Sequence, residues 1–189
     1  MEIYKILKGI FKPVFKVLYR PIIINSENIP KTGSFIFAGN HKKAIDPIMI
    51  AISTKRVVRF LAKKELHEGH AKIFFKVLKT IPVDRINKNK NGITAAIDAL
   101  NNGEVIALFP EGTRNKTNNV ILPFKFGAVT LAKKTNSPII PFAITGEYKM
   151  FRKNISIEFG TPIVVGDIEL EEANQNLMNT VKNLMRKKG

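Results

Sequence analysis

His41 and Asp46 stand five residues apart within a short polar segment, residues 40–47. An imidazole can take a proton from a hydroxyl group, and a carboxylate on its other ring nitrogen fixes the tautomer and stabilises the imidazolium. The spacing therefore predicts a general base, His41, with Asp46 as its orienting group. A core histidine beside an ordinary helix-capping aspartate would give the same pattern, so the pair needs support from other residues.

A second group of candidate residues follows the apolar run that ends near Phe109. Open α/β sheets bind ligands just beyond the carboxyl ends of their strands. Glu111 and Arg114, with Gly112 and Thr113 between them, suit a loop that holds an anion and a hydroxyl group together. In the alternative reading, the glycine and threonine form a simple turn and the arginine is a solvated surface charge.

Two more cations, Lys63 and Arg85, also follow segments that we expect to be strands. Each could by itself be an ordinary surface charge. Together with Arg114 they place three positive charges at three strand ends, which converge along one rim of a sheet. A substrate that carries a phosphate would satisfy such a cluster.

The sequence predicts no metal site. His67 and His70 enclose only two residues, the spacing is not H-E-x-x-H, and no third group of ligands stands nearby. The chain also lacks a Walker loop and a dinucleotide-binding fingerprint, so we expect no bound cofactor.

The candidate residues must be positioned by the elements that precede and follow them. Residues 34–39 form a short apolar run bounded by turn residues, which is typical of a buried strand. Asp46 and Pro47 suit the cap and first position of a helix. His41 is therefore expected at a strand-to-helix corner.

Further strands and helices alternate along the chain. Strands are expected at residues 21–24, 57–62, 80–83, 105–109, 139–144 and 155–159. Helices are expected at residues 72–78, 93–100 and 126–134, and from near Asp167 onward. This alternation predicts a single α/β domain with a mostly parallel or mixed central sheet flanked by helices.

The first 20 residues predict a basic amphipathic helix. Lys5, Lys8, Lys12 and Lys16 fall on one side of a helical wheel, with isoleucine, leucine and phenylalanine opposite. Such a helix is typical of a membrane-surface anchor. A first helix packed on the core is the alternative, and Pro13 is expected to kink or split it.

The 189-residue chain carries 31 basic and 15 acidic residues, a net charge of +16. This balance indicates a polyanionic partner, either an anionic membrane surface or nucleic acid. We see no signal peptide and no run near the ~20 apolar residues that span a bilayer, so we expect any membrane contact to be peripheral. The chain has no cysteine, which excludes thiol chemistry.

Four blocks in order resemble the glycerolipid acyltransferase family, which contains the bacterial 1-acyl-glycerol-3-phosphate acyltransferases. The blocks are Asn40 to Asp46, Ile81 to Arg85, Phe109 to Arg114, and Ile140 to Gly146. The resemblance implies that residues 21–189 are an acyltransferase domain behind the membrane-surface helix of residues 1–20. It also implies transfer of a fatty acyl group from acyl-CoA or acyl carrier protein to a lysophospholipid hydroxyl, without a metal or bound cofactor.

The resemblance further assigns roles to individual residues. His41 is implied as the general base and Asp46 as its orienter. The loop from Glu111 through Gly112 and Thr113 to Arg114 is implied to bind the glycerol phosphate. Lys63 and Arg85 are implied as further phosphate contacts.

The resemblance leads us to expect a peripheral enzyme on the cytoplasmic face of the cell membrane, acting on 1-acyl-glycerol-3-phosphate in phospholipid biosynthesis. Another lyso-lipid acceptor is one alternative. A basic nucleic-acid- or membrane-binding module without catalysis is another. The sequence has no aromatic-interleaved basic motif and no tryptophan, so we expect no nucleic acid partner.

Overall fold

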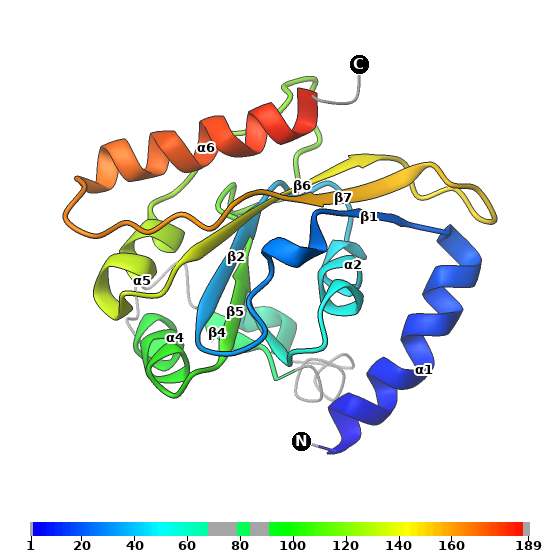
Figure 1. The fold of residues 1–189 in the computed structure, drawn as a ribbon, viewed down its shortest axis with the longest axis horizontal. Coiled ribbons are helices and arrows are strands. Elements are labelled where there is room, and N and C mark those ends of the chain that lie inside the picture. Colours follow the sequence, from blue (N-terminus) through cyan, green and yellow to red (C-terminus); the bar gives the residue numbers. More distant parts are fainter. Residues whose placement is uncertain (1, 68–78, 84–90, 187–189) are drawn as a thin grey trace.

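The computed structural model describes residues 2–67, 79–83 and 91–186, in which seven strands form one sheet (Figure 1). The spatial order of the strands is β1-β7-β6-β2-β5-β3-β4. The strands are β1 (Ile22–Ile24), β2 (Phe35–Gly39), β3 (Val58–Lys63), β4 (Ile81–Val83), β5 (Val105–Leu108), β6 (Ile139–Gly146) and β7 (Ile155–Phe159). All neighbours pair in parallel except β6 and β7, which are antiparallel. The predicted α/β fold with a mixed sheet is confirmed.

Helices cover both faces of this sheet (Figure 1). The helices are α1 (Glu2–Tyr19), α2 (Asp46–Ser53), α4 (Asn91–Asn101), α5 (Gly127–Thr135) and α6 (Leu170–Arg186), with short 3-10 helices η1 (Ser26–Asn28) and η2 (Lys64–His67). Helices α4, α5 and α6 pack on one face, whereas α2 and the buried ring of Phe15 from α1 pack on the other. The helix expected at residues 72–78 lies outside the described residues.

Strand β2 runs through the middle of the core, and all five of its residues are buried. Phe35 and Phe37 point to the α2 face, and Ile36 and Ala38 point to the opposite face. The continuous apolar run that predicted this strand follows from this burial on both faces. At its end the chain approaches β6 so closely that a Cβ on Gly39 would overlap the carbonyl oxygen of Phe142.

The carboxyl ends of four parallel neighbours, β2, β5, β3 and β4, meet at one edge of the sheet. The segments that carry His41, Glu111 and Lys63 leave the sheet at this edge. The convergence of strand ends expected from the sequence is therefore observed in the backbone. The tertiary fold gathers segments that are far apart in the chain.

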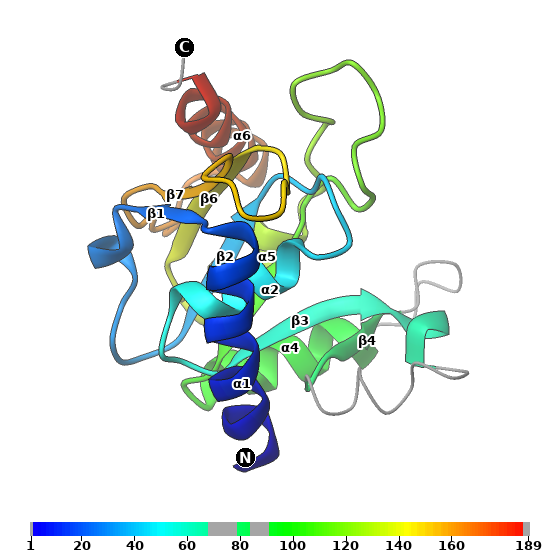
Figure 2. The same cartoon turned by 90° about the vertical axis from the view of Figure 1, so that its right-hand side faces the viewer.

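Helix α1 runs along one side of the domain and is not split at Pro13, contrary to one of the two expectations for that residue (Figure 2). Its last turns pack on the domain: Phe15 is buried, and the centroid of the Tyr19 ring lies 4.9 Å from that of the Phe15 ring. Within the described residues, no helix combines the length and the apolar character needed to cross a bilayer.

Candidate active site

The turn after β2 is fixed to the neighbouring strand by the side chain of Asn40. Its amide nitrogen donates to the carbonyl oxygen of Ile144 at 2.9 Å, and the amide of Ile144 donates back to the Asn40 oxygen at 2.7 Å. The buried side chain thus continues the β2–β6 hydrogen bonding beyond the end of the strand. The two hydrogen bonds thus fix the position of the next residue, His41, just beyond the carboxyl end of β2.

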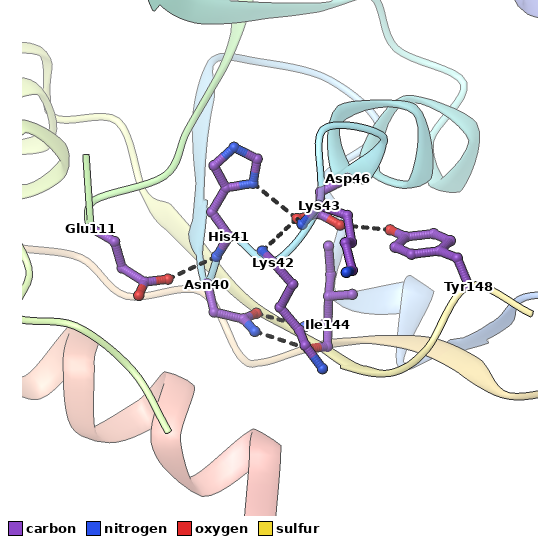
Figure 3. Close-up of polar contacts among 8 residues, drawn as sticks. All are labelled: Asn40, His41, Lys42, Lys43, Asp46, Glu111, Ile144 and Tyr148. Carbon is purple, nitrogen blue, oxygen red and sulfur yellow. Dashed lines mark hydrogen bonds and ion pairs between the residues drawn. The ribbon is translucent and has the colours of Figure 1, made fainter. Parts of the chain in front are cut away.

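The His41–Asp46 pair predicted from the sequence is formed, with 2.9 Å between His41 Nδ1 and Asp46 Oδ2 (Figure 3). Asp46 is fully buried. The same Oδ2 accepts the backbone amides of Lys42 at 2.7 Å and Lys43 at 2.8 Å, and Oδ1 accepts the hydroxyl of Tyr148 at 2.7 Å. These four contacts satisfy the hydrogen-bonding capacity of the buried carboxyl group.

Asp46 does not cap α2 as expected from the sequence. It is the first helical residue, Ile45 occupies the cap position, and that cap makes no side-chain hydrogen bond. The carboxylate instead turns back to the amides of the preceding turn and to His41. The reason is that the preceding turn places two amide donors and an imidazole together within reach of this carboxylate.

This geometry sets the chemistry of the imidazole. Because Nδ1 faces a carboxylate, it carries the hydrogen in the neutral ring, and the lone pair lies on Nε2. Nε2 is on the side of the ring away from Asp46 (Figure 3). The ring also stacks on Phe109, with 3.9 Å between centroids and 15° between planes. His41 is thus held in the orientation that a general base needs, with its side chain 17% exposed.

Glu111 ties the second predicted loop to the first. One carboxylate oxygen accepts the amide of His41 at 2.7 Å, and the other accepts the amide of Leu122 at 2.8 Å. The side chain is 4% exposed. Burial raises the pKa of Glu111, and the two amide hydrogen bonds partly offset this effect. These contacts give Glu111 a positioning role, and its predicted contact with the acceptor stays a prediction.

The loop that begins at Glu111 stays close to His41 through its next four residues. Gly112 has φ +72°, a left-handed conformation that glycine adopts without strain. Thr113 and Arg114 are exposed. The amide of Asn115, the next residue, donates to the carbonyl oxygen of His41 at 2.8 Å. The backbone on either side of Arg114 is therefore fixed to the segment that carries the imidazole.

The other predicted cations are farther from the pair or outside the described chain. Lys63 ends β3, which is separated from β2 by β5, so its backbone lies about 10 Å from that of β2. Its ammonium lies 3.8 Å from Glu65, and both side chains are about half exposed. Arg85 lies outside the described residues.

Three residues of this site were not singled out in the sequence. Tyr148 supplies the hydroxyl on Asp46, Phe109 supplies the ring under His41, and Asn40 anchors the turn. Asn40 and Phe109 lie inside blocks that the sequence did identify, so their positions were a usable signal. Tyr148 lies 102 residues from Asp46, and nothing in the spacing connects the two.

The described residues contain no group of three or more histidine, cysteine or acidic side chains arranged to hold a metal ion. The arrangement instead contains an oriented imidazole at the rim of a sheet, backed by a buried carboxylate. Such a pair can take a proton from a hydroxyl group.

Comparison with known proteins agrees with this arrangement. The sequence profile of the acyltransferase family matches residues 20–145 of the chain. The 1-acyl-sn-glycerol-3-phosphate acyltransferase of Borreliella burgdorferi is 30% identical over 88% of this chain and 70% of its own length. The chain belongs to the acyltransferase family. Membership of this family shows that the protein is an enzyme. It excludes the non-catalytic binding module that the net charge alone also allowed.

Two further relatives extend this result over most of the chain. The 1-acyl-sn-glycerol-3-phosphate acyltransferase of Bacillus subtilis is 29% identical over 87% of this chain and 84% of its own length. The crystal structure of the 1-acyl-sn-glycerophosphate acyltransferase PlsC from Thermotoga maritima superposes with a TM-score of 0.76. It covers 95% of this chain and 77% of its own, at 25% identity. The protein is thus an O-acyltransferase with the fold of that enzyme.

Proposed function

We propose that this acyltransferase moves a fatty acyl group from acyl-CoA or acyl carrier protein to the free hydroxyl of 1-acyl-glycerol-3-phosphate, forming phosphatidic acid in phospholipid biosynthesis. The observation that carries the proposal is the oriented His41–Asp46 pair in a chain whose relatives are named for this reaction. The acyl donor enters as a co-substrate, and the proposal requires no resident cofactor.

In the proposed reaction, Nε2 of His41 takes the proton of the acceptor hydroxyl while the oxygen attacks the thioester carbonyl. The tetrahedral intermediate collapses as the carbon–sulfur bond breaks, and the imidazolium returns the proton to the departing thiolate. Asp46 stabilises the imidazolium formed between the two steps. General-base assistance of this kind contributes about 10²- to 10⁴-fold to the rate.

The acceptor phosphate is proposed to bind the cations at the same rim. Arg114 is the first candidate because its loop is hydrogen-bonded to His41 through Asn115 and Glu111. A guanidinium can bind a phosphate with two parallel hydrogen bonds. Gly112 and Thr113 shape this loop, and Lys63 and Arg85 are proposed as more distant phosphate contacts.

Membrane contact is proposed through α1, on the cytoplasmic face of the cell membrane. Its outward side shows Ile10, Phe11, Val14 and Val17, which are between 46% and 64% exposed. An amphipathic helix with such a face lies in the interfacial layer of a bilayer. A peripheral position of this kind gives the enzyme access to a lipid acceptor.

The proposal is tested by an acyl-transfer assay with the purified protein. The acceptors are 1-acyl-glycerol-3-phosphate, lysophosphatidylglycerol and lysophosphatidylcholine, each with acyl-CoA and with acyl carrier protein as donor. We expect 1-acyl-glycerol-3-phosphate to give the highest kcat/KM. A higher value for another lyso-lipid would reassign the acceptor, and no transfer with any pair would refute the proposal.

His41→Ala should abolish turnover while leaving acceptor binding largely intact, because the base is lost and the phosphate site is not. The measurement is kcat together with acceptor affinity from equilibrium binding. Near-normal kcat in this variant would rule out His41 as the base.

Arg114→Ala should chiefly raise the KM for the acceptor, since it removes a charge that binds the phosphate. Loss of one charged hydrogen-bonding partner typically costs about 1.5–3 kcal/mol, so an increase of roughly tenfold or more is expected. Lys116→Ala, an exposed cation two residues further on, is the matched control. Equal KM values for the two variants and the wild type would remove Arg114 from the phosphate site.

A further inference from the structure

The connection between β6 and β7, residues 147–154, exposes two large apolar side chains at its tip. Met150 and Phe151 are each 62% exposed, among the highest values for large apolar residues in the described chain. Phe151 also has φ +59°, a left-handed conformation that is costly for a bulky residue. Packing in the core does not explain why the chain holds this exposed aromatic ring on strained backbone.

The hairpin tip lies against the end of α1. The amide of Phe151 donates to the carbonyl oxygen of Leu18 in the last turn of that helix. At the root of the hairpin, the ring of Tyr148 lies 5.6 Å from Tyr19 and 6.2 Å from Phe15. Both views show the hairpin beside the carboxyl end of α1 (Figures 1 and 2).

The charges around the tip are mostly positive. Lys149 precedes the two apolar residues, and Arg152 and Lys153 follow them, all exposed. Lys149 pairs with Glu147 at 3.1 Å, which makes the flank that contains Arg152 and Lys153 the more basic one. Apolar side chains framed by cations are complementary to the acyl chains and anionic headgroups of a membrane surface.

We infer that the β6–β7 hairpin is a second membrane-contact element, whose Met150 and Phe151 enter the interfacial layer of an anionic bilayer beside α1. The inference rests on the proposed function, in which α1 alone makes that contact. Two contacts fix the orientation of the domain on the bilayer, whereas one helix leaves it free to rotate. Because Tyr148 in the same hairpin donates to Asp46, this orientation also holds His41 at a fixed height over the lipid headgroups.

The chain contains no tryptophan, so a single introduced tryptophan reports on its own position. Phe151→Trp places the probe at the hairpin tip and Val14→Trp places it on α1. Val164→Trp is the matched control: Val164 is 68% exposed, and it follows Ile163, which pairs with Ile139 at the other end of β6. The vesicles contain phosphatidylglycerol and phosphatidylcholine, with or without bromine on the acyl chains.

We expect a blue shift and quenching by brominated chains for the probes at positions 151 and 14, and no change at position 164. Quenching at 14 but not at 151 would overturn the hairpin inference and leave the α1 contact standing. Quenching at neither position would overturn the hairpin inference and the proposed membrane contact together. A spectral change at 151 on adding acyl carrier protein, without quenching by vesicles, would mean that the tip binds a protein donor, and would also overturn it.

Two further variant proteins measure how much the hairpin tip contributes to membrane binding. Met150→Gln with Phe151→Asn removes both apolar groups, and asparagine accepts the left-handed backbone at position 151. We expect several-fold weaker partitioning into phosphatidylglycerol vesicles and an unchanged melting temperature. Val164→Thr should partition like the wild type. Equal partitioning of all three proteins would contradict the inference.

Discussion

Asp46 organises the candidate site at the scale of single residues. A buried carboxylate is costly unless it is hydrogen-bonded, and this one accepts donors from two amides, an imidazole and a phenol. The amides fix the turn, the imidazole is the proposed base, and the phenol comes from the β6–β7 hairpin. Asp46 therefore joins the turn that carries His41 to a segment about a hundred residues later in the chain.

Tyr148 is a positioning residue for this pair, and its hydroxyl should affect the reaction through Asp46. Burial, and secondly the charge of Asp46, raise the pKa of Tyr148, so the phenol stays protonated and acts as a donor. Tyr148→Phe removes that donor but keeps the ring. We expect kcat to fall about tenfold, the scale of one hydrogen bond to a charged group. The measurements are kcat and kcat/KM, each against pH.

The pH profile separates positioning from packing. Without the phenol, the carboxylate attracts a proton on the imidazole more strongly, so the acidic limb of the kcat/KM profile should move to higher pH. Tyr19→Phe is the matched control, because Tyr19 belongs to the same ring cluster. A profile for Tyr148→Phe that coincides with the control would mean that the hydroxyl does not act on Asp46.

At the scale of elements, α1 exposes apolar side chains as well as Lys16, which a simple reading of its charges did not predict. The sequence indicated a lysine face available to anionic lipid. In the structure Lys8 donates to the carbonyl oxygen of Arg56 at 2.8 Å and Lys12 is half-buried, whereas Ile10, Phe11, Val14 and Val17 are exposed. Lys8 therefore binds within the protein and does not belong to a lysine face that is free for anionic lipid. The outward apolar face remains the basis for the proposed insertion.

Lys8 should make the stability of the protein depend on pH. Burial, and secondly the charge of Lys12, lower the pKa of Lys8 to about 8, against 10.5 for the free side chain. The folded state thus binds this proton less tightly than the unfolded state. The resulting destabilisation is fully present below pH 8 and is relieved as the pH rises from about 8 to 10.5.

Lys8→Met removes this charge at similar side-chain length. We expect its melting temperature to exceed that of the wild type more at pH 7 than at pH 10, because only at the lower pH does the wild type carry the charge at this position in the folded state. Lys16→Met, at an exposed position of the same helix, should show no such difference between the two pH values. A constant offset for Lys8→Met would contradict the argument.

At the scale of the whole molecule, the net charge of +16 should govern how strongly the enzyme associates with membranes. The Debye length falls from about 10 Å at 0.1 M salt to about 3 Å at 1 M, so attraction to anionic lipid weakens as salt rises. We expect partitioning into phosphatidylglycerol vesicles to fall at least tenfold over this range. Partitioning into phosphatidylcholine vesicles, measured in parallel, should change little. Equal salt dependence on both lipids would show that the charge does not drive the association.

Some features of this protein follow from the sequence alone, because they depend on residues close together in the chain. Alternation of apolar runs and helical spacing predicted β2, α4 and β5 to within about two residues. The spacing of His41 and Asp46 predicted their contact, since a single turn brings the two together. The order of the four blocks predicted the family, which the comparisons confirm.

Other features were decided only by the tertiary structure, because they join residues far apart in the chain. Glu111 reaches the amide of His41 across 70 residues and that of Leu122 across 11, so its carboxylate joins two loops in a way that the sequence did not predict. Tyr148 reaches Asp46 only because β6 lies beside β2 in the sheet. Sequence periodicity shows which side of an element is buried, but which residues meet there depends on strand order and register.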